Sequence, residues 1–293
     1  MARSTENPKQ IVEFFDIAIG ALEIQGQHSP QTTKQIIDII RDFLRFCSSN
    51  GYEMIADLTP EFVEAFIHLP VADSSGRRKP SEPTQRNRRG ALRSGYRAMR
   101  QLGYLVFDPL VDIQTLNREY QTQPICTTQH VEALRENSLQ EIIDSPRALI
   151  IALAEAGASN GEITILTWDH VQFEHSVVCL PGHLRIDPRH NRLTDWGSEL
   201  LNKKRRNKSP NDLVVTNFIG QPISAASVSQ SFKQVTEFSG LGRYGYTLNS
   251  VRAWRGREIF QERGRIEEVS RFIGSRSLDN TARFLGWDWR GAA

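Results

Sequence analysis

Apolar residues recur at helical spacing through the first roughly 115 residues, and this pattern restricts the fold of that part more than any other feature. One stripe, in which neighbours lie three or four residues apart, consists of Ile36, Ile37, Ile40, Phe43, Leu44 and Cys47. Thr59, Pro60 and Glu61 are typical of a helix start, with a cap, a proline in the first turn and an acid. The polar, proline-bearing stretch 70–83 predicts a loop. Residues 1–113 are therefore predicted to form a small all-α domain.

The remainder of the chain predicts a second domain of mixed structure. Residues 114–126 are polar and unpatterned and are interpreted as a linker, so this domain covers residues 127–293. Helices are expected at about 128–134, 147–156, 224–238, 249–263, 266–274 and 278–285. A β-branched run at 176–180 predicts a strand, 184–193 a hairpin return, and 212–218 another short strand. The expected fold class is mainly α, with a small antiparallel sheet in the second domain.

Global composition excludes several classes of protein. Lys plus Arg number 36 and Asp plus Glu 34, so the net charge of +2 rules out a histone-like chain. Cys47, Cys126 and Cys179 are too widely spaced for a disulfide framework or a metal site, and we expect no metal and no cofactor. The N-terminal MARSTENPKQ has no apolar core of a signal peptide, and no run is long enough to span a membrane. We therefore expect a cytoplasmic protein without membrane contact.

Positive charge is concentrated between Gly76 and Arg100, where nine basic residues accompany a single acid, Glu82. Five of them follow one another at spacings of 3, 4, 4 and 3 and so share one helix face: Arg86, Arg89, Arg93, Arg97 and Arg100. An arginine stripe without paired acids repels itself, which favours an anionic partner such as a phosphate backbone. A solvated surface helix is the alternative interpretation.

Two further basic groups lie in the second domain. The first is the run Lys203, Lys204, Arg205 and Arg206 before a Ser-Pro turn. The second surrounds Trp254 and includes Arg252 and Arg255. Three groups spread over both domains favour double-stranded DNA as the partner, because a single steering patch would be local.

Three segments of the second domain resemble the motif segments of the tyrosine recombinase (phage integrase) family. They are AEAGASNGEITILTWDHV at 154–171, YTLNSVRAWRG at 246–256 and FIGSRSLDNTARFLG at 272–286. Their order and spacing make the set specific, and the first domain is similar to the helical core-binding domain of the family. The resemblance implies a SAM-like helical bundle followed by a catalytic-type domain that binds duplex DNA, with homo-oligomers on that DNA.

The same resemblance allows each catalytic position to be checked. In that family a tyrosine attacks a DNA phosphodiester, two arginines hold its oxygens, a hairpin lysine serves the leaving oxygen, and histidine or tryptophan assists. The corresponding positions here are Ser159 for the first arginine, Asn249 for the histidine, Arg252 for the second arginine, Ser275 for the later histidine or tryptophan, and Phe284 for the nucleophile. The hairpin 181–193 contains no lysine, and His183, Arg185, Arg189 or Arg192 could occupy its place.

Only Arg252 matches its motif residue, and it could hold a phosphate or pair internally, for instance with Glu162. Because Phe284 has no hydroxyl, the usual covalent intermediate cannot form. We expect a catalytically inactive, DNA-binding pseudoenzyme associated with the nucleoid. Its role would be architectural, accessory or regulatory in recombination of a mobile element, alongside active tyrosine recombinases. The alternatives are an active recombinase with an atypical site and a protein–protein adaptor.

Overall fold

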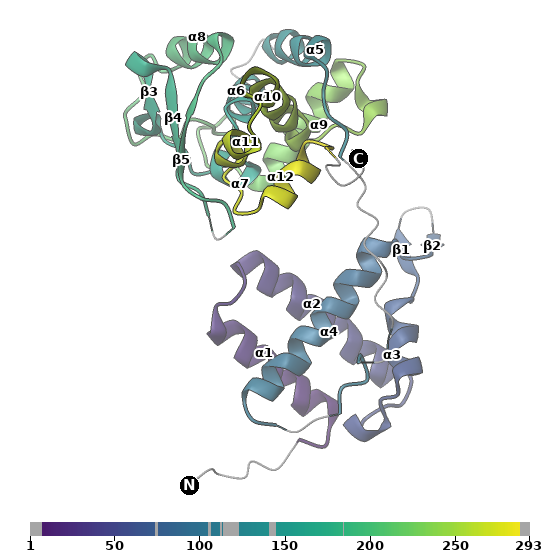
Figure 1. Ribbon diagram of the computed structural model, residues 1–293. Coiled ribbons are helices and arrows are strands. Elements are labelled where there is room, and N and C mark those ends of the chain that lie inside the picture. Colours follow the sequence, from purple (N-terminus) through teal and green to yellow (C-terminus); the bar gives the residue numbers. More distant parts are fainter. Residues whose placement is uncertain are drawn as a thin grey trace. The chain divides into compact units, whose positions relative to one another are not determined.

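The computed structural model describes residues 8–73, 76–104, 107–111, 113, 123–140, 145–183 and 185–287. Contacts divide the chain into two compact units, Met1–Glu119 and Tyr120–Ala293 (Figure 1). The boundary falls within the stretch interpreted as a linker, of which residues 114–122 lie outside the described residues.

The first unit contains α1 (Ile11–Gln25), α2 (Pro30–Ser49), the 3₁₀ turn η1 (Ile55–Asp57), α3 (Pro60–Ile67) and α4 (Glu82–Gln101). The start signals in the sequence act as expected. The Ser29 side chain accepts from the Thr32 N–H and caps α2, and Thr59 caps α3 in the same way. Gly26 ends α1 in the left-handed region, where glycine is favoured.

An aromatic cluster forms the core of the first unit, where α4 packs against α1, α2 and α3. Phe14, Phe15, Phe43, Phe66 and Tyr96 are all buried and stack edge-on or tilted against one another. A Cβ at position 95 would lie 3.1 Å from the Phe15 ring, so Gly95 allows α4 to approach α1 closely. This packing leaves the arginine-bearing face of α4 directed away from the core.

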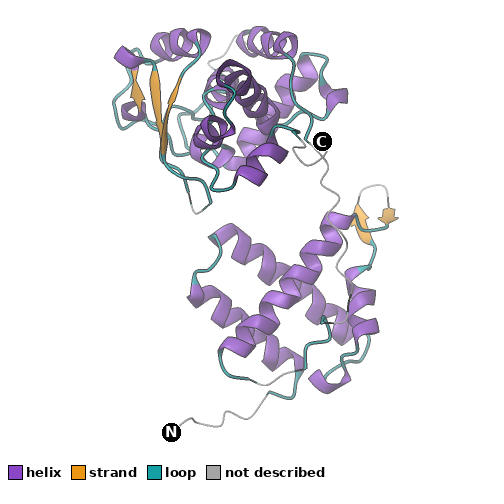
Figure 2. Ribbon diagram, viewed as in Figure 1, coloured by secondary structure: helices purple, strands orange, loops and turns teal. Residues whose placement is uncertain are grey.

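The expectation of a plain loop at 70–83 was wrong. β1 (Val71–Asp73) pairs with β2 (Gly76–Arg78) as an antiparallel hairpin (Figure 2). Each strand has three residues, and the described residues of β2 are all exposed. Strands of three residues are too short to show an alternation of apolar and polar residues in the sequence.

The second unit is mainly helical with a small sheet, as the sequence predicts. Its helices are α5 (Thr128–Leu139), α6 (Arg147–Glu155), α7 (Asn160–Ile163), α8 (Asp195–Lys204), α9 (Ala225–Phe238), α10 (Leu248–Arg263), α11 (Ile266–Ile273) and α12 (Leu278–Phe284). The strands β3 (Val171–Gln172), β4 (Val177–Leu180) and β5 (Arg189–Arg192) form an antiparallel sheet in that order. Val178 of β4 pairs with Asn191 of β5.

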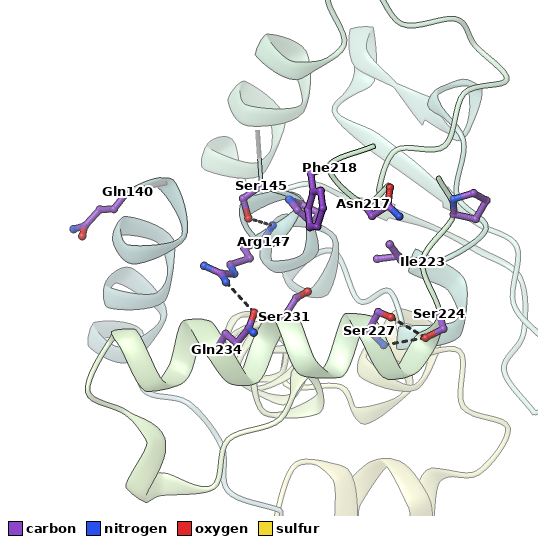
Figure 3. Close-up of a pocket in the computed structure, with 12 residues that line it drawn as sticks. Gln140, Ser145, Arg147, Asn217, Phe218, Ile223, Ser224, Ser227, Ser231 and Gln234 are labelled. Atoms are coloured by element: carbon purple, nitrogen blue, oxygen red, sulfur yellow. Dashed lines mark hydrogen bonds between the residues drawn. The ribbon is translucent and has the colours of Figure 1, made fainter. Parts of the chain in front are cut away.

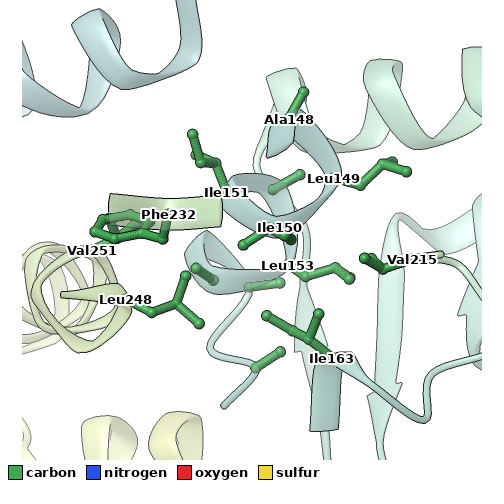
Figure 4. Close-up of a cluster of buried hydrophobic side chains, with 14 of the residues drawn as sticks. Ala148, Leu149, Ile150, Ile151, Leu153, Ile163, Val215, Phe232, Leu248 and Val251 are labelled. Atoms are coloured by element: carbon green, nitrogen blue, oxygen red, sulfur yellow. The ribbon is translucent and has the colours of Figure 1, made fainter. Parts of the chain in front are cut away.

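Helix α6 is the centre of the second core. Every residue from Ala148 to Glu155 is buried, and the helix contacts α5, α8, α9 and α10. Figure 4 shows its apolar side chains beside those of Phe232, Leu248 and Val251. Glu155 is the charged exception: both its oxygens accept from Arg135, at 2.7 Å each. An apolar helix of this kind is typical of the interior of a domain.

Two expectations for this unit were wrong. Residues 212–218 form no strand and make only isolated bridges, Thr167 with Leu213 and Thr216 with Pro222. Helix α8 was not expected, because it contains a glycine and buries only Gly197, Leu200 and Leu201. Its apolar face is too short to produce a periodic signal.

Candidate functional site

The motif positions of the second unit converge on Arg252, which lies in the second turn of α10. Its Nη1 donates to Asn249 Oδ1 at 2.7 Å, and its guanidinium lies 5.5 Å from the centroid of the Phe284 ring. Its Nη2 donates to the carbonyl of Ile273 at 3.4 Å, two residues before Ser275. The fold therefore brings Asn249 and two parts of the segment 272–286 to one guanidinium.

Arg252 is buried, with only 5% of its surface exposed. Its Nε donates to the carbonyl of Gly157 at 3.0 Å, two residues before Ser159. Burial, together with the like charge of Arg189, lowers the pKa of Arg252 to about 10. Arg252 makes no hydrogen bond to Glu162 among the described contacts, so the direct pairing considered from the sequence is not the one found.

Glu162 is instead held by Arg189 of β5. Nη1 of Arg189 lies 2.7 Å from Oε1 of Glu162, and Nη2 lies 3.0 Å from Oε2. The backbone N–H groups of Ser159 and Gly182 also donate to this carboxylate, at 2.8 and 3.1 Å. Burial raises the pKa of Glu162, but the Arg189 guanidinium and Ser159 outweigh it, and the pKa lies below its ordinary value. Ser159 and Glu162 also form a capping box that starts α7.

All N–H groups of Arg189 are used internally. Besides Glu162, they donate to the carbonyls of Phe272 at 2.8 Å, Asp187 at 3.2 Å and Gly157 at 2.7 Å. The sequence offered Arg189 only as one of four residues for the hairpin-lysine position. The missed signal was Glu162, since a buried carboxylate requires a cationic partner.

His183 lies apart from this cluster. It is exposed in the turn between β4 and β5, where its backbone N–H donates to the Ile186 carbonyl at 2.8 Å. Its Nδ1 accepts from the backbone N–H of Arg185 at 3.4 Å. None of the contacts described for His183 reaches Arg252.

The chain is similar to known proteins in structure and not in sequence. No family model matches the chain, and no curated protein matches it in sequence. Solved structures do match, although sequence identity is low. A lambda integrase dimer bound to a COC′ core site aligns at 14% identity over 98% of this chain and 79% of the integrase, with a TM-score of 0.74. The chain has the tyrosine recombinase fold.

Two other tyrosine recombinase structures agree over nearly their whole length. The Tn1549 transposon integrase, in complex with transposon right end DNA, aligns at 13% identity over 92% of this chain and 94% of its own, with a TM-score of 0.70. XerH site-specific recombinase bound to palindromic difH substrate aligns at 14% identity over 98% and 96%, with a TM-score of 0.66. The expected resemblance is therefore confirmed for the fold.

The arginine stripe on α4, in the first unit of this tyrosine recombinase fold, is only partly unpaired. Arg86 pairs with Glu82 at 3.7 Å, and Arg100 pairs with Asp108 at 2.8 Å. Arg89 donates to the carbonyls of Leu110 and Ile113 and is half-buried. The expectation that the stripe has no compensating acid was wrong at two positions. Exposed residues without a partner among the described contacts are Arg93 and Arg97.

The basic residues of the second unit also differ in how exposed they are and in whether they already have a partner. Lys203 and Arg206 are exposed near the end of α8, and Lys204 is half-buried. The Arg205 guanidinium lies 4.3 Å from the centroid of the Phe173 ring. Arg255 pairs with Glu258 at 2.8 Å. The run at 203–206 therefore offers accessible charge, and the region around Trp254 offers less than the sequence suggested.

The second unit also has an apolar hollow of about 900 Å³. Its walls are formed by the start of α6, by α9 and by the turn at 217–223 (Figure 3). Arg147 donates to Gln234 at 2.8 Å across one side, and Phe218 on the rim is exposed. No motif position lines this hollow, so it is separate from the cluster around Arg252.

The described ranges hold neither a candidate metal-binding cluster nor a candidate membrane-spanning helix. They contain no group of three or more His, Cys, Asp or Glu residues arranged to hold a metal ion. Nor do they contain a helix with the length and apolarity that a membrane span requires. The thiols of Cys47 and Cys126 are buried, and burial raises the pKa of each to about 12.

Proposed function

We propose that this protein is a duplex-DNA-binding member of the tyrosine recombinase family that does not cleave DNA. The observation that carries the proposal is the ring of Phe284 beside Arg252, at the position where the family has its nucleophile. A phenyl ring cannot form a phosphotyrosyl bond. Ser159 and Asn249 in addition lack the charge or the proton-transfer group of the family residues, and each such loss typically lowers a rate by about 10²–10³.

DNA binding is supported by the exposed arginines of α4 and by the fold. Arg93 and Arg97 lie on the face of α4 opposite its buried residues, beside Gly90 and Ser94. A helix with long cations and small neighbours fits a DNA groove, where arginine binds phosphates and guanine edges. The lambda integrase and the Tn1549 integrase that share the fold are both DNA complexes.

An active recombinase with an atypical nucleophile is the second candidate. Tyr244 and Tyr246 are the last tyrosines of the chain, and Tyr246 Oη lies 2.7 Å from His130 Nδ1, as a nucleophile beside its base would. Burial raises the pKa of the Tyr246 hydroxyl, which disfavours the phenolate. No described contact joins Tyr246 to Arg252. These facts favour the inactive protein.

We further propose an accessory or regulatory role in recombination of a mobile element. A protein that binds the same kind of DNA without cutting it can position or block active tyrosine recombinases. Such a protein would act as a homo-oligomer on DNA or beside those recombinases, in the nucleoid.

The test is capture of genomic fragments by the purified protein at about 150 mM salt, where non-specific phosphate contacts are weakened. Half of each sample is denatured before the retained fragments are sequenced. Enriched fragments that are released by denaturation support specific, non-covalent binding. Fragments that stay attached to denatured protein would overturn the inactive assignment and favour the atypical recombinase.

The adaptor alternative makes a different prediction. If the protein acts only through other proteins, the unmodified protein enriches no DNA fragment. The double variant Arg93→Ala/Arg97→Ala then behaves as the unmodified protein does in the capture experiment. Loss of enrichment in that variant, with its helix content unchanged by circular dichroism, contradicts the adaptor.

A further inference from the structure

Arg189 contacts residues on both sides of position 159, where the family has its first motif arginine. Its Nη2 lies 2.7 Å from the carbonyl of Gly157, two residues before Ser159, and 3.0 Å from Oε2 of Glu162, three residues after it. The N–H of Ser159 itself lies 2.8 Å from that same Oε2. The guanidinium of Arg189 thus reaches the segment 157–162 from a different element, the strand β5.

The buried charges of this centre do not balance. Arg189 and Arg252 share the Gly157 carbonyl, at 2.7 and 3.0 Å, and Glu162 is the buried carboxylate beside them. Two positive charges and one negative charge leave an excess of one positive charge. A buried charge without a counter-charge is unfavourable, so the centre is suited to an anion.

Arg252 is the member of the pair with bonding capacity left. A guanidinium has five N–H groups. Described residues accept three hydrogen bonds from Arg252, through Gly157, Asn249 and Ile273. Arg189, by contrast, uses all its N–H groups within the protein.

We propose that Arg189, in place of the arginine that position 159 lacks, acts as a positioning residue for a phosphate bound at Arg252. It fixes Glu162 and the shared Gly157 carbonyl, and it contributes the second positive charge of the centre. This proposal rests on the proposed function, because the phosphate would be that of DNA. The centre then binds a phosphodiester without cleaving it.

The decisive experiment moves the arginine from one position to the other in the full chain. Three variants are compared with the unmodified protein: Arg189→Ser, Ser159→Arg and the double variant that carries both. An arginine at 159 would approach the carboxylate that Arg189 already holds. Ser159→Arg is therefore expected to lower the melting temperature when Arg189 is present and to raise it when position 189 is serine. Coupling of this kind is the signature of two side chains that compete for one partner.

A second measurement separates positioning from plain structural support. Melting temperatures are recorded in sodium phosphate and in sodium chloride at equal ionic strength and pH. Phosphate is expected to stabilise the unmodified protein, to lose this effect in Arg189→Ser, and to regain it in the double variant. The matched control is Arg263→Ser, which removes an exposed arginine that pairs with Glu268 at 3.2 Å and should keep the phosphate effect.

The results that overturn the proposal are equally clear. The proposal fails if Ser159→Arg lowers the melting temperature by the same amount with arginine and with serine at position 189. It also fails if Arg189→Ser is stabilised by phosphate as much as the unmodified protein is. If Arg189→Ser does not fold, a folded double variant with a phosphate effect supports the proposal, and an unfolded one refutes it. None of these measurements uses DNA, so failure of DNA binding in the capture experiment is a separate result.

Discussion

The ion pair between Glu162 and Arg189 makes a sharp prediction about stability. In Glu162→Gln the shape is kept, but Arg189 loses the two carboxylate contacts at 2.7 and 3.0 Å. The Arg189 side chain is only 6% exposed, so water cannot solvate its guanidinium in place of the lost carboxylate. Removing one partner of a buried pair typically destabilises a protein by about 3–5 kcal/mol. For a unit of this size, that corresponds to a fall in melting temperature of roughly 6–20 °C.

The assay is calorimetric or circular-dichroism melting across pH, with Glu237→Gln as the matched control. Glu237 is 55% exposed and pairs with Lys233 at 3.7 Å, so its variant should change stability by less than about 1 kcal/mol. The pKa of Glu162 is lowered in the folded protein, so its contribution is complete above the unfolded pKa of about 4.3 and is lost as pH falls through the lower folded pKa. The gap between the unmodified protein and Glu162→Gln should therefore narrow only below about pH 4. The reasoning would be refuted if the two proteins were equally stable at pH 7. It would also be refuted if their difference in stability stayed the same after Glu162 is fully protonated.

Three further predictions concern other parts of the molecule. Arg97→Ala should weaken binding to captured DNA about tenfold (~1.4 kcal/mol) by fluorescence anisotropy, whereas Arg45→Ala, whose arginine pairs with Asp42, should not. Phe284→Tyr should give no denaturant-resistant adduct on captured DNA, because Ser159, Asn249 and Ser275 still lack the family's catalytic groups. An adduct on a denaturing gel would contradict this. Gly157→Ala should lower stability by more than about 2 kcal/mol, since a left-handed backbone alone costs about 1–2 kcal/mol and φ is +89° with the new Cβ 2.8 Å from Asn191. Gly161→Ala, with nothing within 4 Å of its Cβ, should be neutral in the same denaturant titration.

The helices were predictable wherever local signals and burial agree. Ser29 and Thr59 cap helices because their hydroxyls accept a backbone N–H that would otherwise lack a partner, a property of the local sequence alone. The hairpin β1–β2 and helix α8 bury too little to leave a periodic pattern. Residues 212–218 are apolar because Val214 and Val215 enter the core from a loop, and sequence alone cannot separate this case from a strand.

The site was predictable position by position but not as a set of contacts. The motif segments fixed which residues gather around Arg252, because their order follows the fold. The partner of Glu162 was not predicted, since Arg189 lies 27 residues away on another element. Only the alternation of β5, which turns Arg189 and Asn191 inward, selects it over Arg192.

The ion pairs along α4 have a consequence for the thermodynamics of association. Each phosphate neutralised on duplex DNA releases about 0.9 of a condensed counterion. Five arginines in contact would contribute about −4.5 to the slope of log affinity against log salt concentration. Because Arg86 and Arg100 already hold acids and Arg89 holds backbone carbonyls, Arg93 and Arg97 are left to displace ions. The contribution of α4 to this slope falls to about −1.8. The DNA affinity that α4 provides should therefore decrease with salt much less steeply than the number of its arginines suggests.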